Sequence, residues 1–351
     1  ALEFIAEQAG RIKQTYGGQA FGGLITGRCT NEELYLFQKF MRLTIGTNHL
    51  DSSARYGQMN SVQAMRRVQG THRWTVTFED LGAADVLLLV GTNITETNPI
   101  TGLAIKEAVK KRQATLITIE SLQPAIGTIS NIVNLSQHHF CVSPTLFRTA
   151  ILGLQKAVVE QNLIVADLTQ QRSSFVTAVT ARLQQLSWQD IQTATGAGQK
   201  AYAAAAQALA KGKRVVVVTG QGLLRSDQGY AGAMNLLDLL LLLGKLDQPG
   251  SGLAPLAEEN NDQGAIEMGA VAEFLPGPVD MTDKSGRDRV LDIWKETPPA
   301  TEGLALVDML ARATSGQLKA MFIVGENPLA SLPAPLEVRE SLDKLDLLVC
   351  Q

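Results

Sequence analysis

Cysteine is scarce in this sequence of 351 residues, which has three copies, Cys29, Cys141 and Cys350, and no Cys-x-x-Cys pair. A zinc site or an iron–sulfur cluster needs three or four ligands that converge on one point. Three distant cysteines do not supply them, and the four histidines include one adjacent pair that would point to opposite faces of a strand. The sequence therefore predicts no metal site of its own and is typical of a reducing compartment.

Long apolar runs and an excess of positive charge are also missing. The longest apolar run, residues 236–243, is interrupted by Asp238 and is too short to span a bilayer. The net charge of -3 provides no basic face for nucleic acid or for an anionic membrane surface. We therefore expect no nucleic-acid partner and no direct insertion into a membrane. Because the chain lacks an initiator Met and stops on an apolar strand, we expect a piece of a longer protein.

Strands and helices alternate along most of the chain. Strands are expected at residues 20–26, 85–91, 115–120, 214–219, 319–325 and 345–350. Helices are expected at residues 2–16, 30–46, 105–111, 144–161, 166–194, 200–211, 230–245, 303–313 and 334–344, with a loop at 250–269 and an irregular stretch at 275–300. This alternation predicts an α/β fold with parallel sheets that are covered on both faces. Ligands bind such sheets in the loops that follow the strands.

Four of these loops carry polar and glycine residues that could contact a ligand. Residues 91–99 offer hydroxyls and amides that could hydrogen-bond a ligand, although capping of the next helix also explains them. Residues 220–229 offer small residues where a phosphate could meet backbone N–H groups, although a glycine-rich turn after a strand is common. Residues 259–269 have more amides and glycines than a surface turn requires. The residue types at 325–329 are explained by a turn alone. None contains the Gly-x-Gly-x-x-Gly run of a plain dinucleotide-binding dehydrogenase. The candidate contacts are Gly91, Asn93, Thr95, Gly220, Gln221, Asn260, Gln263, Gly264, Gly325 and Asn327.

The ordered set of motifs resembles the molybdopterin oxidoreductase family, in particular formate dehydrogenases and the large iron–sulfur subunit of NADH:quinone oxidoreductase (respiratory complex I). The motifs that carry the resemblance are Gly27-Arg28-Cys29-Thr30-Asn31-Glu32-Glu33, the run from Gly46 to Arg55, the 91–99 loop, Asn260-Asn261-Asp262-Gln263-Gly264, Val324-Gly325-Glu326-Asn327-Pro328-Leu329 and Leu348-Val349-Cys350-Gln351.

The resemblance implies two interleaved, doubly wound (Rossmann-like) domains, one formed by residues 1–55 plus 255–351 and the other inserted at 56–254. It also implies that a bis-guanine-dinucleotide pterin would lie with its nucleotide ends in the loops named above. Glu120 falls where the family often has an Asp that binds a guanine or ribose, although Ser121 replaces the Pro that usually follows. If retained, this molybdopterin guanine dinucleotide pocket would be vestigial.

Three positions depart from the catalytic pattern of the formate dehydrogenases. After the Ala54-Arg55 pair, Gly57 stands where the family has its metal-binding cysteine or selenocysteine, and Gln58 stands where it has a histidine. Ala257 stands where an arginine would hold the substrate anion. Formate chemistry needs a soft metal ligand, a proton acceptor and an anion clamp, so we expect no catalytic and no metal-binding residue in this chain.

These departures favour a structural part of the large iron–sulfur subunit of complex I over an enzyme. The resemblance then implies that iron–sulfur clusters lie in a preceding segment, that other subunits of a respiratory complex are the partners, and that the chain is cytoplasmic and peripheral to the inner membrane through that complex. The alternative is an active molybdenum or tungsten oxidoreductase with a non-cysteine ligand. Asp51, Ser52 and Ser53 are nearby for that role, but at the wrong offset.

Overall fold

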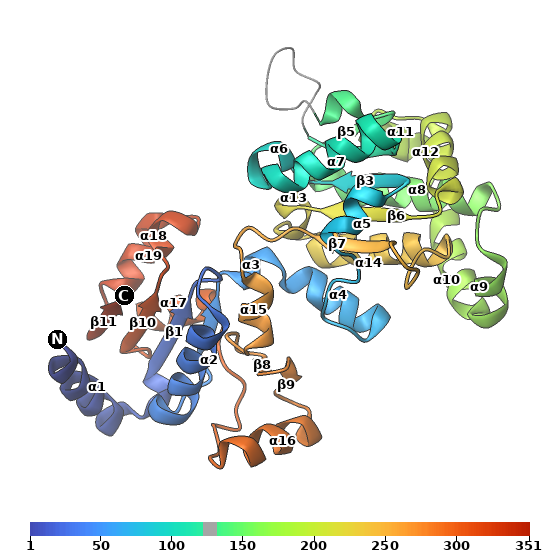
Figure 1. Ribbon diagram of the computed structural model, residues 1–351. Helices are drawn as coiled ribbons and strands as arrows, with labels where there is room; N and C mark the ends of the chain where they lie inside the picture. Colours follow the sequence, from blue (N-terminus) through green and yellow to red (C-terminus); the bar gives the residue numbers. More distant parts are fainter. Residues whose placement is uncertain (122–131) are drawn as a thin grey trace. The chain divides into compact units, whose positions relative to one another are not determined.

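The computed structural model describes residues 1–121 and 132–351 and divides them into two compact units (Figure 1). The first unit consists of Ala1–Met59 and Glu259–Gln351, and the second is the intervening segment Asn60–Glu258. The sequence prediction placed the two divisions after residues 55 and 254, whereas the chain divides after residues 59 and 258. Each unit has its own parallel sheet and its own hydrophobic core.

The first unit is built on a parallel sheet with the strand order β11-β10-β1-β2. The strands are β1 (Phe21–Ile25), β2 (Leu50–Ser52), β10 (Ala320–Val324) and β11 (Leu347–Cys350). Because β1 lies between two neighbours, all five of its residues are buried. Two apolar clusters cover the two faces of the sheet, one centred on Leu24 and Met321 and the other on Phe21 and Ala320.

Helices and short turns surround this sheet. They are α1 (Leu2–Tyr16), η1 (Gly18–Ala20), α2 (Asn31–Lys39), the π-helical η2 (Phe40–Ile45), α3 (Ala54–Gly57), α15 (Asp262–Glu267), α16 (Lys284–Trp294), α17 (Leu306–Thr314), α18 (Pro328–Ser331) and α19 (Pro335–Leu342). A small antiparallel pair, β8 (Phe274–Leu275) and β9 (Val279–Asp280), precedes α16. Thr30 caps α2 in a reciprocal capping box with Glu33.

A buried arginine ties η2 to the segment that follows α15. Arg42 is 1% exposed. It donates to the backbone carbonyls of Gly269, Val271 and Phe274 at 3.2, 2.8 and 2.9 Å, and to the side chain of Asn48 at 2.6 Å. Burial lowers the pKa of this guanidinium to about 10, so it stays charged at neutral pH and its donors are satisfied by carbonyl dipoles.

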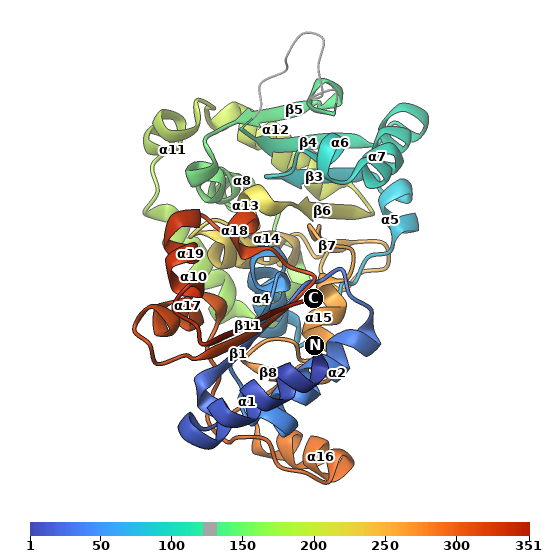
Figure 2. The same ribbon diagram turned by 90° about the vertical axis from the view of Figure 1, so that its left-hand side faces the viewer.

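The second unit is built on a larger parallel sheet with the strand order β5-β4-β3-β6-β7 (Figure 2). The strands are β3 (Val86–Val90), β4 (Thr115–Glu120), β5 (His138–Cys141), β6 (Val215–Thr219) and β7 (Gly252–Pro255). The chain runs outward from β3 in one direction and resumes with β6 on the other side. The strand order therefore reverses between β3 and β6, where sheets of this kind bind ligands.

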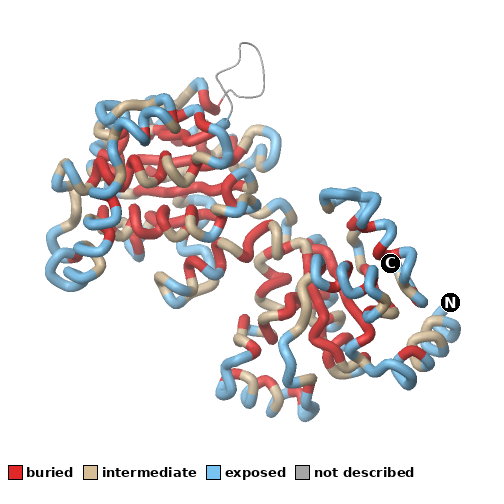
Figure 3. Tube along the Cα trace, turned by 180° about the vertical axis from the view of Figure 1, so that it is seen from behind, coloured by how far each residue is buried: buried red, intermediate tan, exposed pale blue. Residues whose placement is uncertain are grey.

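The sheet of the second unit is buried under helices, as the burial colours of Figure 3 show. The helices and turns are α4 (Met59–Gln69), α5 (Phe78–Ala83), α6 (Ile94–Thr97), α7 (Pro99–Arg112), η3 (Val133–Leu135), η4 (Pro144–Leu146), α8 (Phe147–Glu160), α9 (Ala166–Gln171), α10 (Ser173–Gln184), α11 (Trp188–Thr195), α12 (Gln199–Lys211), α13 (Gln221–Leu224) and α14 (Gly229–Leu242). The prediction of an α/β fold with parallel sheets is confirmed.

Some elements differ from the sequence prediction. The single helix expected at 166–194 is three helices, α9, α10 and α11, because the chain leaves helical geometry at Arg172 and again before the capping residue Ser187. The stretch expected to be irregular contains α16, and the loop expected at 250–269 contains β7 and α15. Within the described residues, no helix combines the length and apolar character that crossing a bilayer requires.

Candidate functional site

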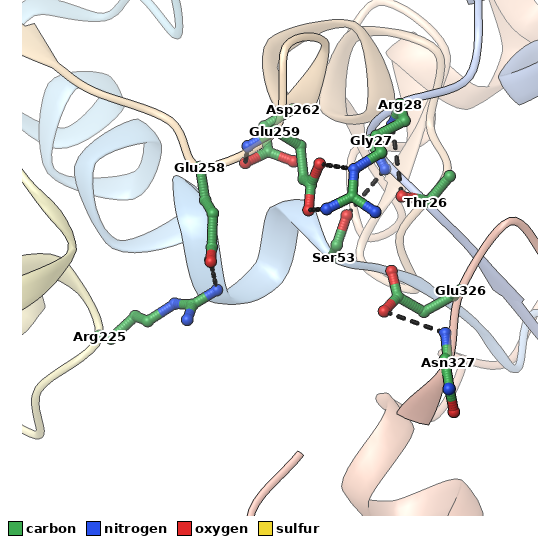
Figure 4. Close-up of polar contacts among 10 residues, drawn as sticks. All are labelled: Thr26, Gly27, Arg28, Ser53, Arg225, Glu258, Glu259, Asp262, Glu326 and Asn327. Atoms are coloured by element: carbon green, nitrogen blue, oxygen red, sulfur yellow. Dashed lines mark hydrogen bonds and ion pairs between the residues drawn. The ribbon is translucent and has the colours of Figure 1, made fainter. Parts of the chain in front are cut away.

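The carboxyl ends of the strands in the first unit bring three chain segments together. Gly27 follows β1, Ser53 follows β2, and the Gly27 amide donates to the Ser53 hydroxyl at 2.7 Å (Figure 4). The Asn261 amide donates to the Gly27 carbonyl at 2.8 Å, which fixes the start of α15 at the same edge of the sheet. The motifs 27–33, 46–55 and 260–264 therefore form one site, although they are far apart in the sequence.

A buried carboxyl group lies at the centre of this site. Asp262, the first residue of α15, is 1% exposed. A Cβ atom on Gly57 would lie 3.1 Å from the Asp262 carboxyl carbon and closer still to Oδ2. A Cβ atom on Gly27 would lie 3.2 Å from the same carbon and closer still to Oδ1. The carboxyl group is therefore held between two glycines, and each glycine leaves room for one of its oxygens.

Gly57, where the sequence predicts that a metal ligand is missing, lies beside this carboxyl group, and Gln58 follows it in the chain. Gly57 is the last residue of α3 and Gln58 is 1% exposed. Arg55, earlier in α3, is held by Asp51 at 2.6 Å and by both oxygens of Glu273 at 2.8 Å. Burial raises the pKa of Glu273 and the Arg55 guanidinium lowers it more, so the net shift is downward. These ion pairs fix the backbone on which Gly57 lies.

Three further polar side chains near this site are hydrogen-bonded within the first unit. Arg28 donates to Glu259 at 2.7 Å. The Asn261 side chain donates to the Cys29 carbonyl at 2.9 Å, and Gln263 donates to Glu267 at 3.0 Å. The Arg28 guanidinium, which follows β1, is therefore paired with the Glu259 carboxylate of the same unit.

Gly264 and Gly325 are required by close approaches. A Cβ atom on Gly264 would collide with the side chains of Asn31 and Asn261, and one on Gly325 would lie 2.7 Å from the Thr26 methyl group. Gly325 also has a φ of +65°, which favours glycine. The amide of its neighbour Asn327 donates to the Glu326 side chain at 3.3 Å. At these positions the backbone geometry by itself accounts for the glycines.

In the second unit, Glu120 ends β4 with a buried carboxyl group. It is 4% exposed and accepts a hydrogen bond from the Thr92 amide at 2.5 Å. Burial raises the pKa of Glu120 to about 7, and the Thr92 amide partly offsets that shift. Glu120 therefore holds a proton well into the neutral range, in contrast to an exposed glutamate.

The two loops beside the reversal of strand order pack directly on each other. The Gly222 amide donates to the Gly91 carbonyl at 2.9 Å, and the Gly220 amide donates to the Val90 carbonyl at 3.0 Å. Gly91 has a φ of +61°, and a Cβ atom on it would lie 2.6 Å from the Leu223 amide nitrogen. Backbone amides that a phosphate would need therefore donate within the chain.

Three neighbouring polar side chains are also engaged within the second unit. The Gln221 side chain donates to the Leu256 carbonyl at 2.9 Å. Asn93 donates to Glu96 at 2.5 Å at the start of α6, where Thr95 is half-buried. Arg225, in the loop after β6, forms an ion pair with Glu258.

The residues selected from the sequence thus fall into two groups. Those in the first unit are Gly57, Gln58, Asn260, Gln263, Gly264, Gly325 and Asn327, and those in the second are Gly91, Asn93, Thr95, Glu120, Gly220, Gln221 and Ala257. Asn260 is exposed, whereas its neighbour Asp262 is buried at the site. Sequence reasoning missed Asp262. The available signal was a carboxylate in a run of amides.

The similarity to known proteins extends over the whole chain. A protein-family model described as molybdopterin oxidoreductase matches residues 1–351. NADPH-Fe(3+) oxidoreductase subunit alpha of Geobacter sulfurreducens is 30% identical over 341 residues, which are 97% of this chain and 39% of that protein. Formate dehydrogenase H of Escherichia coli is 26% identical over 353 residues, which are 100% of this chain and 48% of that protein. The chain therefore spans less than half the length of these relatives.

A solved structure shares the fold. The acetylene hydratase of Pelobacter acetylenicus matches with a TM-score of 0.71 and 16% sequence identity, covering 99% of this chain and 49% of that one. The likeness extends over both units of the chain.

Proposed function

The chain belongs to the molybdopterin oxidoreductase family, and from that premise we propose that it forms the structural body of the large iron–sulfur subunit of a respiratory NADH:quinone oxidoreductase. In this proposal the catalytic metal-ligand position has been lost. The observation that carries the proposal is Gly57, which has no side chain to bind a metal at the position where the family pattern has its ligand.

The donor set around position 57 does not fit a molybdenum or tungsten ion. The family pattern calls for an anionic sulfur or selenium ligand, and neither glycine nor the following Gln58 supplies one. Within the described residues, no group of three or more His, Cys, Asp or Glu side chains could hold a metal ion. Asp51 is committed to Arg55, and the Ser53 hydroxyl accepts from the Gly27 amide. We therefore derive no reaction step through a metal at this site.

In this proposal, the loops that would hold a pterin nucleotide in the family are packed turns that bind no ligand. The amides of Gly220 and Gly222 donate within the chain, and the Arg225 and Arg28 guanidinium groups have carboxylate partners. Within each unit, a nucleotide that bound at these loops would compete with the contacts made there. The retained glycines keep the loops in their close approach, and the pocket is vestigial.

Electron transfer in the whole protein would use parts beyond this chain. The relative from Geobacter sulfurreducens is by its name the alpha subunit of an NADPH-Fe(3+) oxidoreductase, and 39% of its length matches this chain. That relationship supports a place in a nicotinamide-linked enzyme of several subunits. We propose that iron–sulfur clusters lie in sequence outside this chain and that other subunits of a respiratory complex are its partners. The complex would be cytoplasmic and peripheral to the inner membrane.

Metal and pterin analysis of the full-length protein tests this function. The protein is produced in a host that supplies the pterin cofactor, with molybdate and tungstate in the medium, and Escherichia coli formate dehydrogenase H is purified in parallel as the positive control. We expect background molybdenum and tungsten, no fluorescent pterin after oxidation, and no formate oxidation. Stoichiometric metal and pterin, or formate turnover, would refute the structural role.

One observation favours a second candidate function, an active molybdenum or tungsten oxidoreductase with a non-cysteine ligand. Asp262 places a carboxylate beside Gly57, where the family ligand would begin. Carboxylates can bind such metals, but this one is 1% exposed and lies against two glycine backbones. In the same analysis, metal that is present in the native protein and lost on the Asp262→Ala substitution would support this alternative.

A further inference from the structure

We propose that Asp262 is a plug, by which we mean that its carboxyl group fills the volume that any side chain on residue 57 would need. The proposal rests on the proposed loss of the metal ligand at position 57, and it assigns a role there to a second residue, Asp262. Position 57 was not merely emptied, because the space was taken over by a side chain from α15. A ligand could return to position 57 only if Asp262 were replaced as well.

The first argument is the fit of the carboxyl group between the two glycines. Oδ2 lies against Gly57 and Oδ1 against Gly27, and a Cβ atom on either glycine would overlap the oxygen beside it. Real Cβ atoms do not tolerate such an approach, so any side chain at residue 57 requires a displacement. The overlap concerns the first atom of the side chain, so it applies to cysteine, serine and alanine alike.

The second argument is that the backbone on both sides is anchored. On the α3 side, Arg55 is held by ion pairs to Asp51 and Glu273. On the α15 side, the Asn261 amide and side chain donate to the carbonyls of Gly27 and Cys29 at 2.8 and 2.9 Å. Because neither helix can withdraw without breaking these contacts, the Asp262 side chain itself would have to move.

The third argument is the burial of the plug. Asp262 is 1% exposed, and the Glu259 amide donates to its Oδ2 at 3.4 Å. A displaced carboxyl group would need another polar environment in the packed interior. The clash with a new side chain at residue 57 is therefore costly, and shortening residue 262 relieves it.

A double-mutant cycle on the full-length protein tests the plug without reference to metal or activity. The variants are Gly57→Ala, Asp262→Ala and the two combined, and Gly10→Ala is the matched control. Gly10 is also a helical glycine of the first unit, and a Cβ atom on it meets no atom within 4 Å. The readouts are the thermal midpoint Tm and hydrogen exchange in peptides that cover α3 and α15.

We expect Gly57→Ala to lower Tm by roughly 3–8 °C and to raise exchange in both helices, as overpacking of this size does. Gly10→Ala should leave Tm unchanged or higher. In the Asp262→Ala background, Gly57→Ala should lower Tm by much less or not at all. Equal losses in both backgrounds, or a Gly57→Ala variant as stable as Gly10→Ala, would overturn the plug.

An Asp262→Asn variant separates volume from charge, because asparagine keeps the shape and removes the charge. We expect Asp262→Asn not to rescue Gly57→Ala, and rescue by asparagine would overturn the steric account. If Gly57→Ala alone yields no folded protein, recovery of cooperative unfolding in the Gly57→Ala/Asp262→Ala double variant supports the plug, and failure of both refutes it. Metal in the native protein would refute the proposed function, whereas an absence of coupling would refute only the plug.

Discussion

The Glu120→Gln substitution should make the stability of the second unit less dependent on pH. Burial raises the pKa of Glu120 from an ordinary 4.5 to about 7. Between these values the unfolded chain has released the proton and the folded chain still holds it, so stability falls as the pH rises. The loss is complete above about pH 7, because there both states are ionised. Glutamine is neutral throughout and can still accept from the Thr92 amide.

The magnitude follows from the size of the pKa shift. A shift of one unit corresponds to ~1.4 kcal/mol, so the full linkage for Glu120 is about 3 kcal/mol, of which about 2.5 kcal/mol falls between pH 5 and pH 8. Urea unfolding of the native protein and of Glu120→Gln at these two pH values measures it. The native protein should lose about 2.5 kcal/mol relative to the variant as the pH rises.

The control for this measurement is Glu107→Gln, which changes an exposed glutamate on α7. The pKa of Glu107 is lowered through its hydrogen bond with Lys111, so removal of this carboxylate should not reproduce the effect. Native and Glu120→Gln proteins whose stabilities change in parallel from pH 5 to pH 8 would refute the assignment of a buried, proton-holding carboxyl group at the end of β4.

Three further substitutions test the packing around the two sheets. Arg42→Met leaves three buried carbonyls without their donor and should destabilise the first unit by about 3–5 kcal/mol, measured by urea unfolding. Gly153→Ala should cost about 1–3 kcal/mol in the same assay, because the new Cβ would lie 2.7 Å from the Tyr202 ring. Glu273→Gln weakens the bond to Arg55, and because the pKa of Glu273 is lowered, its stabilisation is present at neutral pH and is lost as the pH falls below 4.5. Native and Glu273→Gln proteins should therefore differ in stability at pH 7, and the difference should shrink as the pH falls below 4.5, whereas a constant difference would contradict this.

The elements that could be predicted from the sequence are those set by local pattern. The strands β3 and β6 are continuous apolar runs, Val86–Val90 and Val215–Thr219, which is the pattern of strands buried on both faces. Thr30 carries its own capping box. The short strand β2 was not predicted, because the buried Asp51 at its centre interrupts the apolar pattern of a strand. That carboxylate accepts a hydrogen bond from Arg55, four residues later in α3.

The candidate site was only partly visible in the sequence. Its glycine loops and the glycine at position 57 could be found from motifs, because each motif is local. The contact of Asp262 with Gly27 and Gly57 could not be found, since it depends on how three distant segments meet at the sheet edge. The raised pKa of Glu120 depends in the same way on burial, which a single acidic residue at the end of a strand does not reveal.

The central claim is that no side chain of this chain holds a metal at position 57, and the metal content of the full-length protein tests it most directly. Inductively coupled plasma mass spectrometry should be applied to the native protein and to its Asp262→Ala variant, both produced with molybdate and tungstate beside formate dehydrogenase H. The account predicts background metal in both proteins while the control is loaded. One molybdenum or tungsten per native chain, whether or not the Asp262→Ala variant retains it, would contradict the account.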